Sequence, residues 1–167
     1  MGDEGAGEYE RIVAPDMMVD VPVYRVTWGA NPAVITGKEG VVAFYRSVGE
    51  SVLWHSDDRL AVADWGICDE LTFHQLARGA DLRAVGYDVD DADALYHASS
   101  RQAFIWPYDE RARLAGEHLY EDKTSLAIEE VSPDEAITPA RVREIHREQL
   151  AKLEAEQGDD FWILADA

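Results

Sequence analysis

Polar and apolar residues alternate along the stretch from Ser51 to Arg78, and this pattern is typical of strands rather than helices. The alternation separates two sets of side chains, with Leu60, Val62 and Asp64 on one face and Ala61, Ala63 and Trp65 on the other. Gly66 interrupts the pattern before LTFHQLA resumes it, so two strands or one long kinked strand both account for it. Either alternative predicts a curved, antiparallel sheet.

Two elements are predicted before this stretch. Met17 to Tyr24 is rich in strand-forming residues, and Pro22 within it suggests an edge strand. The segment Thr36-Gly37-Lys38-Glu39 has the spacing of a capping box, in which the threonine and glutamate side chains satisfy free backbone amides. The helix predicted to follow has one apolar face, formed by Val41, Val42, Phe44, Tyr45 and Val48.

A hairpin is predicted after an acidic connection. Tyr96 to Trp106 and Arg113 to Asp122 form its strands, joined by a turn at Pro107-Tyr108-Asp109-Glu110. The connection from Gly79 to Ala94 reads as a loop or the start of a short helix. It does not fit a calcium loop, whose pattern is broken by Ala92 and Asp93, so we expect no metal site there.

The C-terminal part is predicted to be helical. Ser132-Pro133 and Thr138-Pro139 each place a capping residue before a proline, which is typical of a helix start. The second helix has one stripe of packing residues, Val142, Ile145, Gln149, Leu150 and Leu153. The apolar residues Phe161 to Leu164 are expected to dock on this domain or on a partner subunit. These elements predict an α+β fold in one domain, residues 1–167, with a core of about 9–130 and a helical extension over 133–167.

Composition limits the classes of function. With 167 residues and 47% hydrophobic content, the chain is the size of one domain with a substantial core. The formal net charge of -19 disfavours nucleic-acid binding, which depends on a basic surface. We see no apolar run of the ~20 residues needed to cross a membrane and no export signal. Cys68 is the only cysteine, which excludes an internal disulfide and fits the cytoplasm.

Three segments carry a resemblance to a known superfamily: PVYRVTW, the helix GKEGVVAFY, and GEHLYED at Gly116 to Asp122. In this order they resemble the nuclear-transport-factor-2-like (NTF2-like) cone of ketosteroid isomerase, SnoaL-type polyketide cyclases, limonene epoxide hydrolase and scytalone dehydratase. The resemblance covers roughly residues 9–130. It implies a curved antiparallel sheet wrapped with helices into a cone, an apolar pocket for a small hydrophobic molecule, no cofactor, and a homodimer.

The known catalytic positions of the superfamily are replaced in this chain. Val21 stands where ketosteroid isomerases have their catalytic aspartate, and the adjacent Asp20 is expected to face away from the pocket. Gln102 aligns with the aspartate of the isomerase oxyanion hole, and an amide donates hydrogen bonds but does not titrate. Leu119 stands where epoxide hydrolases of this fold have an essential aspartate. The resemblance therefore implies pocket positions at these residues without the relatives' carboxylates.

Other residues are candidates for the chemistry of the pocket. If Leu119 points inward, strand parity puts Glu117 and Glu121 on the same face, and Glu117 is the leading acid/base candidate. His74 is the second, because the pKa of an imidazole lies near neutrality. A carboxylate at the rim and a structural histidine are the alternative interpretations. Further pocket candidates are Trp54, Trp106, Tyr45 and Asp64.

Two hypotheses on function follow. The first is a cofactor-independent isomerase, dehydratase or cyclase, in which Glu117 or His74 moves a proton on a small apolar substrate. The second is a non-catalytic module for ligand binding or subunit association.

Overall fold

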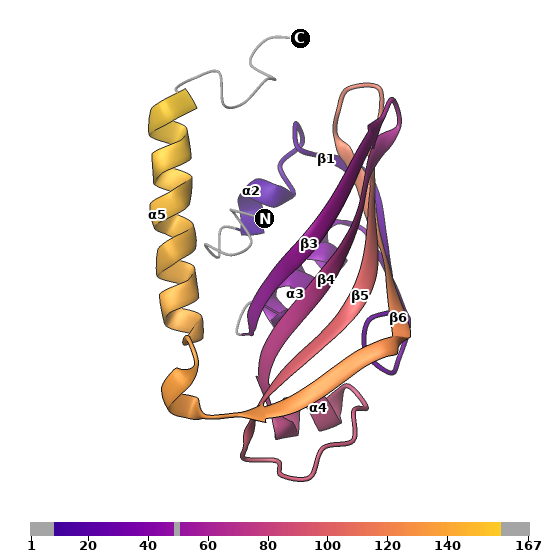
Figure 1. Cartoon of the computed structure of the whole chain (residues 1–167). Coiled ribbons are helices and arrows are strands. Elements are labelled where there is room, and N and C mark those ends of the chain that lie inside the picture. Colours follow the sequence, from indigo (N-terminus) through magenta and orange to yellow (C-terminus); the bar gives the residue numbers. More distant parts are fainter. Residues whose placement is uncertain (1–8, 49–50, 158–167) are drawn as a thin grey trace.

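The computed structural model describes residues 9–48 and 51–157, in which six strands form one curved, mostly antiparallel sheet (Figure 1). The order across the sheet is β2-β1-β6-β5-β4-β3. The strands are β1 (Met18–Val26), β2 (Ala33–Thr36), β3 (Val52–Ala63), β4 (Gly66–Arg78), β5 (Leu95–Pro107) and β6 (Leu114–Val131). The helices are α2 (Tyr9–Ile12), α3 (Lys38–Val48), α4 (Gly79–Ala84) and α5 (Pro139–Gln157), with a 3-10 turn at Pro133–Glu135. The α+β prediction is thereby confirmed.

The long alternating stretch folds as two strands. Strands β3 and β4 pair antiparallel up to Ala63 and Gly66, so Asp64 and Trp65 form the two-residue connection between them. An added Cβ on Gly66 would lie 2.5 Å from the Trp106 carbonyl oxygen, which explains why a glycine stands there. Strands β5 and β6 form the second predicted hairpin, and β6 extends beyond Asp122 to Val131.

Strand β1 departs from the expected topology. It lies between β2 and β6 and pairs parallel with β6, so the expectation of an edge strand is wrong. Pro22 is tolerated because the ladder with β6 is interrupted between Met18 and Val23, where a missing amide costs no ladder bond. The Pro22 carbonyl still accepts a hydrogen bond of 2.9 Å from the Gly37 amide. Strand β2, which occupies the edge, was not predicted.

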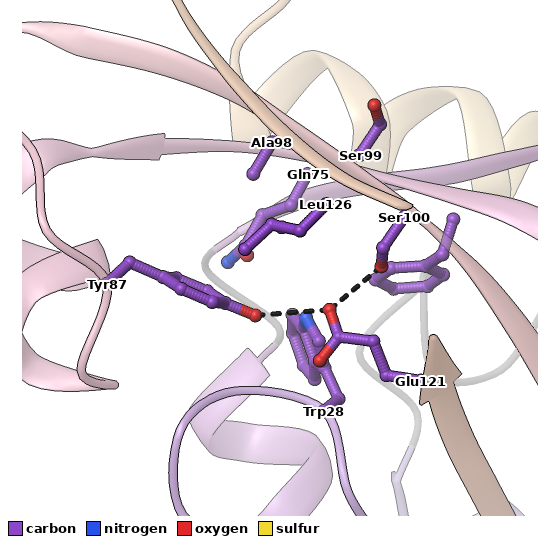
Figure 2. A pocket seen from close by; sticks show the side chains of 9 residues that line it. Trp28, Gln75, Tyr87, Ala98, Ser99, Ser100, Glu121 and Leu126 are labelled. Atoms are coloured by element: carbon purple, nitrogen blue, oxygen red, sulfur yellow. Dashed lines mark hydrogen bonds between the residues drawn. The ribbon is translucent and has the colours of Figure 1, made fainter. Parts of the chain in front are cut away.

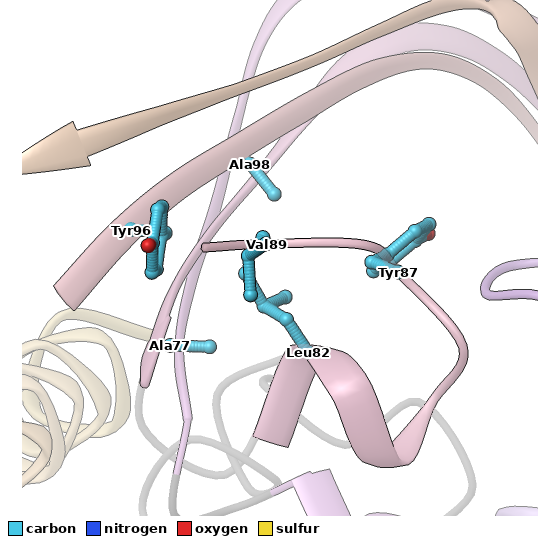
Figure 3. Close-up of a cluster of buried hydrophobic side chains, with 6 residues drawn as sticks. All are labelled: Ala77, Leu82, Tyr87, Val89, Tyr96 and Ala98. Carbon is cyan, nitrogen blue, oxygen red and sulfur yellow. The ribbon is translucent and has the colours of Figure 1, made fainter. Parts of the chain in front are cut away.

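The inner face of the sheet is the one on which α3 packs, and Figure 1 shows this helix behind β3 and β4. One buried cluster joins this helix to β1 and α2: Ile12, Met18, Tyr24 and Val41. A second lies across the middle of the sheet: Val26, Leu71, Phe104 and Leu119. A third fills the end covered by α4 and the segment after it: Ala77, Leu82, Tyr87, Val89, Tyr96 and Ala98 (Figure 3).

The C-terminal helix α5 follows the last strand. The predicted helix start at Ser132-Pro133 yields only a 3-10 turn, whereas that at Thr138-Pro139 begins α5. Within the predicted stripe, Leu150 is buried, but Gln149 and Leu153 are exposed. An ion pair of 3.0 Å between Arg11 and Glu154 connects α5 to α2. The apolar segment Phe161 to Leu164 lies outside the described residues.

Among the described residues, no helix combines the length and the apolar character needed to cross a membrane.

Candidate functional site

A buried carboxylate, Glu121, is the centre of a polar cluster on the inner face (Figure 2). Its side chain has no exposed surface. Oε1 accepts hydrogen bonds from the Tyr87 hydroxyl at 3.3 Å and the Ser100 hydroxyl at 2.9 Å. Oε2 accepts from the Gly29 amide at 3.3 Å and from the Lys123 ammonium. Four donors therefore converge on one carboxylate inside the fold.

Strand register brings these groups together. Gln102 lies opposite Glu121, and Ser100 lies opposite Phe73, so β4, β5 and β6 present neighbouring side chains to the inner face. The Glu121 amide donates to Thr27 Oγ1 at 2.9 Å, which holds the end of β1 beside β6. Lys123 also donates to the Gly29 carbonyl.

Tyr87 reaches the cluster from the segment that follows α4. Its side chain belongs to the third buried cluster, together with Leu82 and Ala98 (Figure 3). Burial, together with the negative charge of Glu121, raises the pKa of Tyr87 to about 12. The phenol is therefore protonated near neutral pH and donates its proton to Glu121.

Two amide oxygens beside this cluster are buried and have no hydrogen-bond partner among the described residues, Gln75 Oε1 and Gln102 Oε1. Gln75 lines a cavity of about 10 Å³, which is room for roughly one water-sized group. The other walls of this inner cavity are Trp28, Phe73, Tyr87, Ala98, Ser99, Ser100, Glu121 and Leu126. Most of the inner face is thus filled by side chains, and the small space that remains has both polar and apolar walls.

The predicted inward parity of β6 is observed. Glu117, Leu119 and Glu121 all point to the inner face, and Leu119 is 3% exposed. Glu117 is buried as well and accepts a hydrogen bond of 2.7 Å from Trp106 Nε1. Gln102, at 2% exposure, completes the group of sequence candidates that the structure brings together on this face.

His74 lies on the opposite, outer face of the sheet. Its neighbours Phe73 and Gln75 point inward, so His74 points away from the Glu117 side. Its ring stacks on Trp54 and His97, and Nδ1 lies 2.9 Å from His97 Nε2. Burial, and secondly His97, lower the pKa of His74. The two acid/base candidates therefore do not share one pocket.

The remaining candidates are dispersed. Val21 is 64% exposed on β1, and Asp64 is exposed in the turn between β3 and β4, so neither lines the inner cavity. Tyr45 belongs to the core on α3, where its hydroxyl lies 3.0 Å from that of Tyr24. Trp54 lies in the outer-face stack rather than in the inner cavity.

An apolar cleft separates α5 from the edge strand β3. It has a volume of about 240 Å³ and is lined by Val52, Leu53, Trp54, Ile137, Val142, Ile145 and His146. This cleft is larger than the inner cavity but has far fewer polar groups in its walls. Within the described residues, no group of three or more His, Cys, Asp or Glu side chains is placed to hold a metal ion.

Sequence reasoning missed the donors Gly29, Ser100 and Lys123 of the Glu121 cluster, and it missed Gln75 beside them. One signal was available, because Ser100 and Gln102 occupy alternate positions of β5 that otherwise carry core residues such as Ala98 and Phe104. Polar residues at inward positions of a predicted strand indicate a buried network.

Solved structures of other proteins share the fold of this chain. No family model and no curated protein matches the chain. Among solved structures, a SnoaL-like protein from Shewanella denitrificans superposes with a TM-score of 0.56 at 12% identity, over 74% of this chain and 85% of that one. An NTF2-like protein from Burkholderia xenovorans gives a TM-score of 0.53 at 10% identity, over 74% and 83% of the two chains. The chain has the NTF2-like fold.

A third solved structure with a similar fold is that of a protein from Mycobacterium tuberculosis in complex with estradiol-17beta-hemisuccinate. Its TM-score is 0.51 at 16% identity, over 75% of this chain and 89% of that one. At these identities the likeness shows the NTF2-like fold alone.

Proposed function

We propose that this chain binds a small hydrophobic molecule at the inner face of its sheet, with the Glu121 cluster as the polar anchor. The observation that carries the proposal is the cluster itself, in which the buried carboxylate of Glu121 and Gln75, whose amide oxygen has no partner among the described residues, line a small cavity. Ligand sites in proteins are mostly apolar, with a few convergent polar groups that fix the orientation of the ligand. The aromatic rings of Trp28 and Phe73, whose centroids lie 5.2 Å apart, form the apolar part of this site.

The hydrogen bonds of Glu121 favour binding over proton transfer at this residue. A carboxylate has about four acceptor positions on its two oxygens. Four donors use them here, from Tyr87, Ser100, Gly29 and Lys123. A general base needs a lone pair within reach of the substrate proton. Glu121 therefore acts as a positioning group in this proposal.

The size of the cavity sets a condition on the ligand. A volume of about 10 Å³ holds one polar group of a ligand but not its apolar body. Binding therefore requires the Trp28 and Phe73 side chains to move aside, so the ligand favours a conformation in which the pocket is open. The steroid derivative bound by the Mycobacterium tuberculosis protein supports a ligand of hydrophobic character.

A test is calorimetric titration with 1-indanol, a compact apolar alcohol, in the wild type and in two alanine variants. Ala98 lines the inner cavity, and Ala98→Leu fills it. Ala103 lies on the outer face of the same strand, so Ala103→Leu is the matched control. We expect binding in the wild type and in the control and at least tenfold weaker binding in Ala98→Leu. Equal binding in all three proteins would refute the inner-face site.

A second candidate function is acid–base catalysis centred on Glu117. It is favoured by the burial of this carboxylate and its hydrogen bond to Trp106 Nε1. In this reading Glu117 moves a proton on the same apolar ligand, without His74. Turnover that persists in Glu117→Gln would exclude it.

We also propose that the chain forms a homodimer through the end of the β3–β4 hairpin. Leu60, Val62 and Trp65 are 63%, 74% and 54% exposed there, on an edge strand and its turn. Exposed apolar side chains gathered at a sheet edge are typical of an association surface.

A further inference from the structure

We infer that the ligand of the inner-face site carries a hydrogen-bond donor, such as a hydroxyl or a primary amine, and that the site disfavours the ketone of the same shape. This inference rests on the proposed function and names the class of ligand. It follows from which donors and acceptors of the cluster are already used.

The donors of the cluster are directed at Glu121. The Tyr87 and Ser100 hydroxyls have one proton each, and both protons point at Oε1. The Gly29 amide and the Lys123 ammonium donate to Oε2, and Lys123 also donates to the Gly29 carbonyl. At Oε1, a ligand carbonyl would therefore have to take the Tyr87 or Ser100 proton away from a buried carboxylate.

The direction of these bonds fixes the orientation of Gln102. Since Ser100 gives its proton to Glu121, its oxygen can only accept from Gln102, which lies at 3.0 Å. The Gln102 group facing Ser100 is therefore the NH₂ group, and its carbonyl oxygen is left buried without a partner. This residue is 2% exposed, so bulk water does not reach it.

Gln75 supplies the acceptor that a ligand can reach, because its side chain lines the inner cavity (Figure 2). The residue is 8% exposed, and its carbonyl oxygen has no partner within the described part of the chain. A buried acceptor without a partner destabilises the protein, and a donor that fills this space removes the penalty. A cavity the size of one water fits a hydroxyl or an amine of a ligand.

The test compares three probes of one shape by calorimetry: 1-indanol, 1-aminoindane and 1-indanone. We expect the alcohol to bind roughly tenfold more tightly than the ketone, since one hydrogen bond to a buried group separates them. The amine is protonated near neutral pH and donates as well, so it should also bind more tightly than the ketone. Equal affinities, or tighter binding of the ketone, would overturn the inference and leave the proposed function standing. If none of the three binds, both fail.

Two variants connect the preference to Gln75. Gln75→Leu removes the acceptor at nearly constant volume, so the alcohol and the ketone should then bind within about twofold of each other. Gln149→Leu, at an exposed position of α5, is the control and should keep the tenfold preference. A preference that persists in folded Gln75→Leu contradicts the assignment. If that variant does not fold, as judged by circular dichroism, the wild-type comparison decides alone.

Discussion

The substitution Glu121→Gln should destabilise the protein although it hardly changes the shape of the side chain. The wild-type carboxylate accepts four hydrogen bonds, from Tyr87, Ser100, Gly29 and Lys123. Glutamine keeps one oxygen but replaces the other by an NH₂ group, which donates. Two of the four donors then face the NH₂ group of the glutamine, which is itself a donor, and lose their hydrogen bonds.

The size of the effect follows from these two lost bonds. An unsatisfied buried donor costs about 1–3 kcal/mol. The new glutamine side chain lowers the stability least if its NH₂ group faces Gly29 and Lys123. The Lys123 side chain is 48% exposed, so its ammonium group can bond to water instead. The loss then comes mainly from the Gly29 amide and the missing charge, and we expect about 2–3 kcal/mol in total.

Urea unfolding at pH 7 measures this loss. With a slope of about 2 kcal/mol/M, the midpoint should fall by about 1 M or more while the slope stays the same. The control is Glu70→Gln on the outer face, where the glutamate side chain is 57% exposed and pairs with Arg101 at 2.9 Å. Water screens that pair, so its loss should move the midpoint little. A Glu121→Gln midpoint equal to that of the control would refute the buried network.

Three further predictions concern pH, association and packing. Burial lowers the pKa of His74 and His118 below 6.5, assisted by His97 and Arg25 respectively. The unfolded chain then binds more protons, so stability is full above about pH 6.5 and falls as the pH drops through the folded pKa values. Urea midpoints should therefore decrease from pH 7.5 to 5.5, and less in His74→Gln; an unchanged pH dependence in that variant would contradict the role of His74. Val62→Asp should shift a dimer to monomer in light scattering, whereas Val34→Asp, 64% exposed on the other edge strand β2, should not; identical masses for both variants would exclude the hairpin surface. In Gly116→Ala the new Cβ would lie 2.0 Å from the Val23 carbonyl oxygen, so we expect a loss of about 2 kcal/mol or more in urea unfolding, and wild-type stability would show that β1 and β6 approach less closely.

The local part of the fold could be predicted from the sequence, because its signals lie within single segments. Alternation and turn residues define the two hairpins on either side of Gly66 and at Pro107 to Glu110. The parallel pairing of β1 with β6 could not be predicted in this way. It joins Val23 to Gly116, far apart in the sequence, and depends on packing that no local pattern records.

The same division holds at the site. Parity within β6 correctly placed Glu117 and Glu121 on one face. It does not reveal that Gly29, Tyr87 and Ser100 arrive from three other segments to donate to Glu121. Those partners are set by tertiary structure. Because they use the acceptor positions of the Glu121 carboxylate, they favour a positioning role for this residue over that of a general base.

The most direct test of ligand binding at the inner face is a titration of labelled protein with 1-indanol, followed by NMR. We expect the largest shifts at the side-chain amides of Gln75 and Gln102 and at the backbone amides of Ser100 and Glu121, which surround or adjoin the inner cavity. Shifts confined to Trp54, Val142 and Ile145 would instead place the ligand in the cleft beside α5 and contradict the account.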